Sequence, residues 1–320
     1  MRGDATGRPP PVAVLTLNPA VDMTYEIDRL LPDRKVHARA TRYDPGGNGI
    51  NVARALKRLQ VPAHTFCVLA GETGGFLERL LRGRIDTLTF ERVAGETRIN
   101  GTAVERDTGN QYEISGVGPA VPEATLERLQ ESFVATTGSG FGVLTGTLQP
   151  GLPPDLYASL TRRIRAQGGR PVVDTHGRSL RAAVAAHPFL IKPNRYELAE
   201  LAGRALDDVA AVAAEAQRLQ RGGIDLVCVS LGGDGALLAA GPKTYYATAP
   251  SVRVDSTVGA GDSMLAGLVC ALARGDRFDN ALRLAVACGA GTVGRPGTEL
   301  FSPGDLTELM ARVSVRTLES

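Results

Sequence analysis

Apolar residues in the first quarter of the chain alternate between strand-like runs and helical spacing. Residues 12–17 form an apolar run of strand length. After a glycine-rich turn at 46–49, the apolar residues of 50–59 recur three and four positions apart, which predicts a helix. Residues 65–69 have the pattern of a second strand and residues 76–81 that of a second helix. The chain therefore begins as an alternation of strands and helices.

The same alternation continues into the C-terminal third. The remaining predicted strands lie at 142–145, 171–174, 189–191 and 226–230, and a hairpin covers 236–249. The predicted helices lie at 124–134, 154–165, between 174 and 189, from Arg195, at 208–220, and at about 261–273 and 278–293. Strands that alternate with helices form a parallel or mostly parallel sheet covered by helices on both faces. The expected fold class is therefore α/β.

Two stretches, at about 23–43 and 88–117, break this rhythm. They carry strand-like pieces at 25–27, 36–42, 88–92, 98–105 and 111–115, and an Asp-Thr-Gly hairpin signal lies at 107–109. Such pieces have few partners in a sheet built from alternating strands and helices. We expect them to form a small second β-sheet, a lid over the crevice at the strand ends, where open α/β folds bind ligands. The predicted domain spans residues 12–320, after a disordered extension at 1–11.

Composition narrows the class of protein. The chain has 320 residues, 43% of them hydrophobic and 22% charged, as in an ordinary globular protein. A formal net charge of +2 gives no reason to expect a nucleic-acid or membrane partner. The first eleven residues lack the apolar core of a signal peptide. Four cysteines in apolar runs, none in a C-x-x-C pair, indicate buried thiols in a reducing compartment, so we expect a cytoplasmic protein.

The stretch Ser-Thr-Val-Gly-Ala-Gly-Asp-Ser-Met at 256–264 is the most informative in the chain. Gly259, Ala260 and Gly261 let backbone N–H groups crowd around an anion, and a helix that begins there adds its positive dipole end. Asp262 would repel a phosphate, but it is well suited to take a proton from a hydroxyl group that attacks one. An ordinary glycine-rich turn with an acid at a helix start would also explain the pattern.

Two further segments carry candidate ligand contacts near the N-terminus. Gly46 and Gly47 allow close backbone approach to a ligand, and Asn51 follows in the first turn of the predicted helix. Asp22 follows the first strand in a Pro-containing loop, where a carboxylate can bind ligand hydroxyl groups. A tight strand-to-helix turn and an Asx-turn are the structural alternatives.

The segment Lys-Pro-Asn-Arg-Tyr-Glu at 192–197 suits a cation. Asn194 and Glu197 are three residues apart on one helix face, where two oxygen ligands could hold Mg²⁺ partly through water. Asp174 ends the preceding strand and could join them. A helix capping box is the alternative, and the two roles are compatible. The G-x-G-x-x-G match at 289–294 follows a helical pattern, which argues against a dinucleotide site.

These motifs occur in the order found in the ribokinase-like, or PfkB, family of sugar kinases, which the chain resembles from about residue 12 to 310. Residues 255–264 are similar to the C-terminal signature of that family and residues 46–56 to its N-terminal signature. Thr-Leu-Asn-Pro-Ala-Val-Asp at 16–22 resembles the phosphosugar branch. Asn48 occupies the position where 1-phosphofructokinases and tagatose-6-phosphate kinases carry Lys, so the resemblance is closest to the minor-type 6-phosphofructokinases.

The resemblance implies a role for each motif. Asp262 would deprotonate the sugar hydroxyl, and Gly259, Ala260 and Gly261 would form the anion hole. The sugar would be held by Asp22, Gly46, Gly47 and Asn51. Its phosphate would be met by Lys35 and Arg98, each of which alone has the pattern of a solvated surface charge, with Thr147 nearby. Ser230, Gly232 and Thr257 would line the nucleotide site, and Asn194 and Glu197 would organise Mg²⁺, with Asp174 nearby.

The expected activity is ATP-dependent phosphorylation of fructose 6-phosphate at its 1-hydroxyl to fructose 1,6-bisphosphate. The same chemistry on fructose 1-phosphate or tagatose 6-phosphate is the nearest alternative, and a non-catalytic sugar-phosphate sensor is a remote one. The resemblance further implies a K⁺ site near 295–299 and a homodimer that pairs through the lid.

Overall fold

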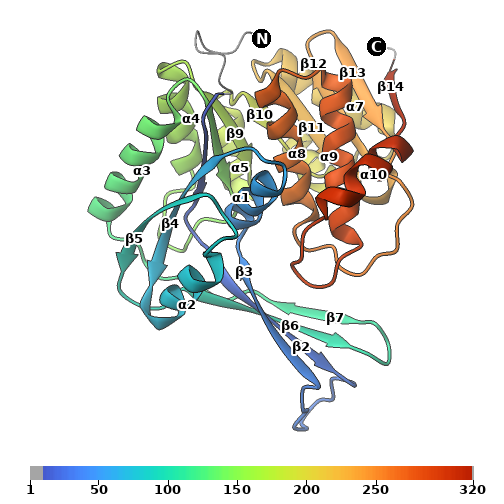
Figure 1. Cartoon of the computed structure of the whole chain (residues 1–320). Helices are drawn as coiled ribbons and strands as arrows, with labels where there is room; N and C mark the ends of the chain where they lie inside the picture. The colour runs from blue at the N-terminus through green and yellow to red at the C-terminus, as the bar shows by residue number, and fades with distance from the viewer. Residues whose placement is uncertain (1–9, 319–320) are drawn as a thin grey trace.

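A large sheet between two layers of helices forms the body of the molecule, and a small sheet projects from one end of it (Figure 1). This computed structural model describes residues 10–318. Nearly all of the predicted N-terminal extension, residues 1–9, lies outside the described residues. The expected α/β class, with a mostly parallel sheet, helices on both faces and a small separate sheet, is confirmed.

The large sheet is parallel from β5 to β11 and antiparallel from β11 to β14. In spatial order its strands are β14 (Val315–Leu318), β13 (Lys243–Ala247), β12 (Ala236–Ala240), β11 (Leu226–Ser230), β10 (Leu190–Ile191), β9 (Arg170–Asp174), β8 (Phe141–Thr145), β1 (Val12–Thr16), β4 (Ala63–Ala70) and β5 (Thr87–Val93).

Helices cover both faces of this sheet, as the alternation of strands and helices predicts. One face is covered by α1 (Asn48–Arg58), α2 (Gly71–Leu81), α8 (Ala260–Arg274), α9 (Phe278–Val293) and α10 (Leu306–Arg312). The other face is covered by α3 (Glu123–Thr137), α4 (Leu156–Ala166), α5 (Gly177–Val184), α6 (Arg195–Ala202) and α7 (Val209–Arg221). Single 3₁₀ turns lie at Gly232–Asp234 and Pro303–Asp305.

Side-chain direction along β1 explains the two cores. Val12 and Val14 pack on the face of α1 and α8, whereas Ala13 and Leu15 pack on the face of α3 and α4, because successive strand residues point to opposite sides. Helix α8 is buried along almost its whole length, from Asp262 to Ala273. Each large apolar side chain buried in such a helix stabilises the fold by about 1.5–3 kcal/mol. The N-terminus of α8 is thus held firmly in place.

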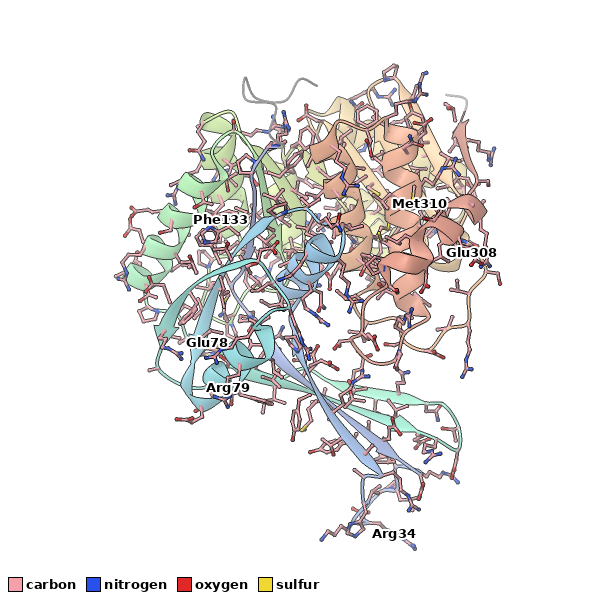
Figure 2. The ribbon with its side chains drawn as sticks, viewed as in Figure 1. Arg34, Glu78, Arg79, Phe133, Glu308 and Met310 are labelled. Carbon is pink, nitrogen blue, oxygen red and sulfur yellow. The ribbon has the colours of Figure 1, made fainter. Side chains whose placement is uncertain are left out.

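The small sheet has the order β3 (Ala40–Gly46), β2 (Ala20–Ile27), β6 (Arg98–Glu105) and β7 (Gln111–Ile114). Figure 2 shows its far end, where Arg34 is labelled, well away from the body. Residues 88–92, expected in this sheet, lie instead in β5 at the edge of the large sheet, because they pair in parallel with β4. The strand expected at 36–42 begins later, at Ala40, since its register is fixed by pairing with β2.

Two elements near the C-terminus, α10 and β14, were not predicted. Both are short, and β14 is ordered by antiparallel pairing with β13 rather than by its own sequence pattern. All four cysteines are buried and free, as expected. Among the described residues, no helix has the length and apolar character needed to cross a membrane.

Candidate active site

Residues from distant parts of the chain converge where the parallel strands end and the small sheet begins. Asp174 ends β9, Lys192 follows β10 directly, and Ser230 ends β11. The N-termini of α1 and α8 meet this edge as well, since Asn51 of α1 contacts Asp262 of α8. Carboxyl ends of parallel strands are the usual ligand site of open α/β sheets.

Asp262 lies at the centre of this convergence. Its side chain is buried, its Oδ2 accepts a hydrogen bond from Asn51 Nδ2 at 3.0 Å, and its Oδ1 accepts one from Asn48 Nδ2 at 3.1 Å. Burial raises the pKa of Asp262 to about 6, and repulsion from Asp174 acts in the same direction. A carboxylate with a raised pKa, held by two amides, has the properties of a general base that works near neutral pH.

The turn formed by residues 259–261, here named the anion turn, has the backbone geometry of an anion site. Gly259 is the N-cap of α8 and has φ 76°, a left-handed conformation that glycine adopts without strain. Ala260 and Gly261 follow as the first helical residues. The Ala260 N–H donates to the Thr257 carbonyl at 3.3 Å. The positive dipole end of this fifteen-residue helix lies at the same turn as the Asp262 side chain.

Lys192 is a site residue that the sequence argument did not assign. Its Nζ lies 3.2 Å from Asp174 Oδ2, and the side chain of Lys192 is buried while that of Asp174 is 13% exposed. A Cβ atom added to Gly261 would lie 3.4 Å from the same Nζ, so the ammonium group borders the anion turn. The pKa of Lys192 is raised, because attraction to Asp174 and Asp262 outweighs burial. A lysine directly after a buried strand, in a chain with few lysines, was the available signal.

Asp22 and Gly46 form one wall of the expected sugar site. Asp22 lies within strand β2, not in a loop as expected, because the turn after β1 ends at Pro19 and the chain re-enters a strand at Ala20. Asp22 Oδ1 accepts a hydrogen bond from Asn100 Nδ2 at 2.8 Å, and burial raises the pKa of Asp22. A Cβ atom at Gly46 would lie 2.2 Å from the Asp22 carboxyl group, so only glycine fits opposite this carboxylate.

Arg98 and Thr147 meet near the same wall, through Asn18. Arg98 donates from Nη2 to the Asn18 carbonyl at 2.9 Å, and Asn18 Nδ2 donates to Thr147 Oγ1 at 3.2 Å. Arg98 is half-buried, and burial lowers its pKa. Gly47 supports the turn beside them with φ 99° as the N-cap of α1.

Lys35 does not lie in this group. It is exposed in the connection between β2 and β3, next to Arg34 at the far end of the small sheet (Figure 2). Within a single chain it is therefore far from Asp22 and Arg98, because the two strands carry the connection away from the body.

A cavity of about 580 Å³ borders the anion turn. Ser230, Gly232 and Thr257 line it, as do Ala260 and Gly261. Its other walls come from Gly233, Gly235 and Met264, from residues between 249 and 254, and from the side of α9 between 286 and 293. The volume is in the range of small-molecule sites. The three residues expected to contact the nucleotide thus share one cavity that opens onto the anion turn.

Asn194 and Glu197 form the capping box that was the structural alternative. Asn194 Oδ1 accepts from the Glu197 N–H at 2.9 Å, and Glu197 Oε2 accepts from the Asn194 N–H at 2.8 Å. Glu197 keeps its second carboxylate oxygen outside these two bonds. Burial raises the pKa of Glu197, and repulsion from Asp174 adds to the effect. Within residues 10–318 no three His, Cys, Asp or Glu residues form a ready-made metal cluster, so these oxygens fit a partly hydrated Mg²⁺ better than an ion held by protein alone.

The segment 295–299 packs against two arginines. The Pro296 carbonyl accepts from Arg42 Nη2 at 2.8 Å, and the Thr298 carbonyl accepts from Arg54 Nη1 at 3.3 Å. Two of the backbone oxygens in the segment expected to hold K⁺ are therefore already engaged by cationic side chains.

Asn48 is the other residue whose contact was not foreseen. Its hydrogen bond to Asp262 joins helices whose contacting residues are 214 positions apart in sequence, which no local pattern reveals.

The arrangement has the parts that phosphoryl transfer requires. A buried carboxylate and an anion turn lie side by side, a nucleotide-sized cavity opens on one side, and a carboxylate with a half-buried arginine lies on the other. Positioning and charge stabilisation supply most of the catalysis in such reactions.

Comparison with known proteins agrees with this description. The sequence profile described as pfkB family carbohydrate kinase matches residues 15–304. The 1-phosphofructokinase of Bacillus subtilis is 34% identical over 310 residues, which cover 96% of this chain and 100% of the relative. The ATP-dependent 6-phosphofructokinase isozyme 2 of Escherichia coli is 33% identical over 307 residues, 95% of this chain and 99% of the relative.

Solved structures agree as well. Phosphofructokinase-2 from Escherichia coli in complex with substrates and products has a TM-score of 0.91 at 32% identity, covering 94% of this chain and 98% of that one. The same protein in complex with potassium has a TM-score of 0.90 at 32% identity, with the same coverage. The likeness thus extends over the large sheet, the small sheet and the site between them.

Proposed function

The chain belongs to the pfkB family of carbohydrate kinases and is an ATP-dependent phosphosugar kinase, and we propose that it phosphorylates fructose 6-phosphate at the 1-hydroxyl. The observation that carries the proposal is that the side-chain amides of Asn48 and Asn51 both donate hydrogen bonds to the Asp262 carboxylate. Asn48, where a lysine would mark the 1-phosphofructokinase and tagatose-6-phosphate kinase pattern, donates to this carboxylate. The relatives are named 1-phosphofructokinase and 6-phosphofructokinase, and the proposal chooses fructose 6-phosphate between these two substrates.

In the proposed reaction Asp262 accepts the proton of the sugar 1-hydroxyl, and the oxygen of that hydroxyl forms a bond to the γ-phosphorus of ATP. The bond between that phosphorus and the β,γ-bridging oxygen breaks, and ADP leaves. Backbone N–H groups at Gly259, Ala260 and Gly261 would stabilise the charge on the transferring group, and that of Ala260 would have to leave the Thr257 carbonyl to do so. Lys192, beside Gly261, adds a fixed positive charge there.

The substrate would lie between the small sheet and α1. Asp22, Gly46, Gly47 and Asn51 would hold the sugar hydroxyls, and Arg98, close to Thr147, would bind the 6-phosphate. Arginine suits this task, because its planar guanidinium binds phosphate through two parallel hydrogen bonds. Ser230, Gly232 and Thr257 would contact ATP in the cavity that they line.

Magnesium would be held by Asn194 and Glu197, with Asp174 close by, each through water or a single oxygen. When bound, the ion neutralises charge on the phosphates and orients them. We place K⁺ near 295–299, since a structural neighbour has been solved in complex with potassium. The carbonyl groups of Pro296 and Thr298 already accept hydrogen bonds from arginines, so other oxygens of the segment would have to supply the ligands.

A homodimer through the small sheet completes the proposal. Tyr43, Ile99, Tyr112 and Ile114 are exposed together on one face of this sheet, and such a cluster of apolar side chains marks an interaction surface. Pairing of two small sheets would cover them, and it would also bring Lys35 near the partner subunit.

Fructose 1-phosphate is the second candidate substrate, because 1-phosphofructokinases are among the relatives at 34% identity. The test is ADP release with MgATP and, separately, fructose 6-phosphate, fructose 1-phosphate and tagatose 6-phosphate. The proposal predicts the highest kcat/KM for fructose 6-phosphate. A higher value for fructose 1-phosphate would overturn this choice of substrate while leaving the kinase assignment intact.

A further inference from the structure

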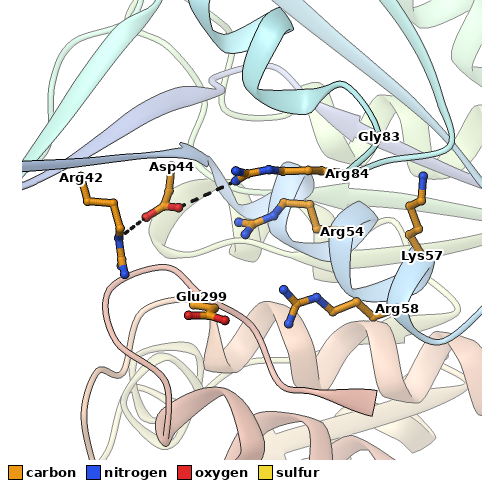
Figure 3. A pocket seen from close by; sticks show the side chains of 8 residues that line it. All are labelled: Arg42, Asp44, Arg54, Lys57, Arg58, Gly83, Arg84 and Glu299. Carbon is orange, nitrogen blue, oxygen red and sulfur yellow. Dashed lines mark ion pairs between the residues drawn. The ribbon is translucent and has the colours of Figure 1, made fainter. Parts of the chain in front are cut away.

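A cavity of about 520 Å³ with a strongly basic lining lies beside α1 (Figure 3). Five cationic side chains line it, Arg42, Arg54, Lys57, Arg58 and Arg84, against the two carboxylates of Asp44 and Glu299. Its lining shares no residue with the nucleotide cavity, nor with the residues assigned above to the sugar. Glu299 belongs to the segment 295–299 proposed for K⁺, but the cavity differs in lining and in charge from the nucleotide and sugar sites.

The carboxylates present do not compensate this charge. Asp44 pairs with Arg42 Nε at 2.7 Å and, more loosely, with Arg84 Nη1 at 3.8 Å. Lys57 Nζ lies 3.7 Å from Asp86 at the edge of the cavity. Within residues 10–318, neither Arg54 nor Arg58 has a carboxylate at ion-pair distance. Asp44 acts on Arg54 and Glu299 on Arg58 only from beyond ion-pair distance. Two partly or fully buried guanidinium groups thus face the cavity without a carboxylate in direct contact.

Arg54 shows the consequence most clearly. It is 5% exposed, and burial lowers its pKa to about 10, although Asp44 and Asp22 act in the opposite direction. Its Nη1 donates to the Pro45 carbonyl and to Asn51 Oδ1, each at 3.1 Å. Among the described residues its Nε and Nη2 make no hydrogen bond of their own, so donors remain for a ligand. A buried cation without an anionic partner is costly, and an anion would relieve that cost.

Arg58 and Arg84 add donors in the same space. Arg58 donates from Nη1 to the carbonyl groups of Leu300 and Phe301, which fixes its guanidinium at the cavity wall. Figure 3 shows the guanidinium groups of Arg54, Arg58 and Arg84 extending in the same direction, toward the side of the cavity where Asp44 and Glu299 lie. Several guanidinium groups that converge on one space are the arrangement that recognises phosphate.

We propose that this cavity is a second anion site, which binds the phosphate group of a small organic phosphate. Its volume exceeds that of a phosphate ion and is within the range of small-molecule sites. A single residue, Asn51, connects the cavity to the proposed base, because Arg54 donates to Asn51 and Asn51 donates to Asp262. The proposal does not depend on which fructose phosphate is the substrate.

The experiment is calorimetric titration with two probes, inorganic phosphate and glycerol 3-phosphate. The catalytic site is first filled with MgAMP-PNP and with whichever fructose phosphate the enzyme turns over. The variant Lys57→Gln/Arg84→Gln removes two cations that are each at least a third exposed, so the fold should be retained. The matched control is Arg82→Gln, an exposed arginine two residues away that does not line the cavity.

We expect one probe molecule to bind per chain, tighter for glycerol 3-phosphate. Affinity should fall at least about tenfold in the double variant and stay unchanged in the Arg82→Gln control, because each charge-assisted bond to phosphate contributes appreciably. Unchanged turnover of the double variant without probe would verify its fold. Two results would overturn the proposal: no binding of either probe to the filled enzyme, or equal binding by the wild type and the double variant.

Discussion

The Asp262→Asn variant removes the proposed base. Its free energy of unfolding, measured relative to wild type, should be higher at neutral pH than in acid. Folding raises the pKa of this carboxyl from about 3.9 in the unfolded chain to about 6. The ionised form is therefore disfavoured in the native state. The stability that the protonated group contributes is full below about pH 4 and is lost as pH rises through about 6.

The magnitude follows from the pKa difference. About two pKa units correspond to roughly 3 kcal/mol, of which about 2 kcal/mol should be lost between pH 4.5 and pH 8. The amide of the Asp262→Asn variant is neutral throughout this range, so the variant escapes the loss. The new amide must find an acceptor for its own NH₂ group, and Asn48, which is exposed, can rotate its amide to present an oxygen. Any fixed cost of this exchange is the same at both pH values.

The assay is urea unfolding of wild type and Asp262→Asn at several pH values without ligands. The free energy of unfolding of the variant, relative to wild type, should rise by about 2 kcal/mol from pH 4.5 to pH 8. Asp207→Asn, an exposed carboxylate before α7, controls for the loss of a charge as such. A relative stability of Asp262→Asn that does not change with pH would refute the argument that burial raises this pKa.

Three other variants test the remaining assignments. Arg98→Ala should raise KM for the phosphosugar by about 10–100-fold with little change in kcat, because a charge-assisted phosphate contact is lost; an unchanged KM would make Arg98 a structural residue. Gly46→Ala would put a Cβ atom 2.2 Å from the Asp22 carboxyl group, so sugar affinity should be lost, and a normal KM would contradict the assigned wall. Glu197→Gln keeps an acceptor for the Asn194 N–H, so the Tm should hold while the Mg²⁺ concentration needed for half-maximal activity rises about tenfold; a lower Tm with unchanged Mg²⁺ dependence would leave only the capping role.

Local pattern was enough to predict the alternation of strands and helices and the helix that begins beside Asp262. Each of these depends on residues that are close in sequence, such as the apolar spacing after Gly259. The prediction that residues 88–92 belong to the lid was wrong, because their place depends on pairing with a strand distant in sequence. Their short polar and apolar mixture suits either sheet, and only parallel pairing with β4 decides between them.

The parts of the site that were missed are made by long-range contacts. Lys192 and Asp174 pair because neighbouring parallel strands end at the same edge. Asn48 contacts Asp262 because α1 and α8 lie on the same face of the sheet. The basic cavity draws its arginines from β3, α1 and the loop after α2, which are separate in sequence. Contacts of this kind depend on the tertiary fold and leave no signal in a single stretch of chain.

The central claim is that Asp262 is the base of a fructose-phosphate kinase, and steady-state kinetics of Asp262→Asn with MgATP and fructose 6-phosphate tests it most directly. We predict that kcat falls by roughly 10²–10⁴ while KM for the sugar changes little, because the carboxylate acts on the proton in the transition state. Turnover close to that of wild type would contradict the account.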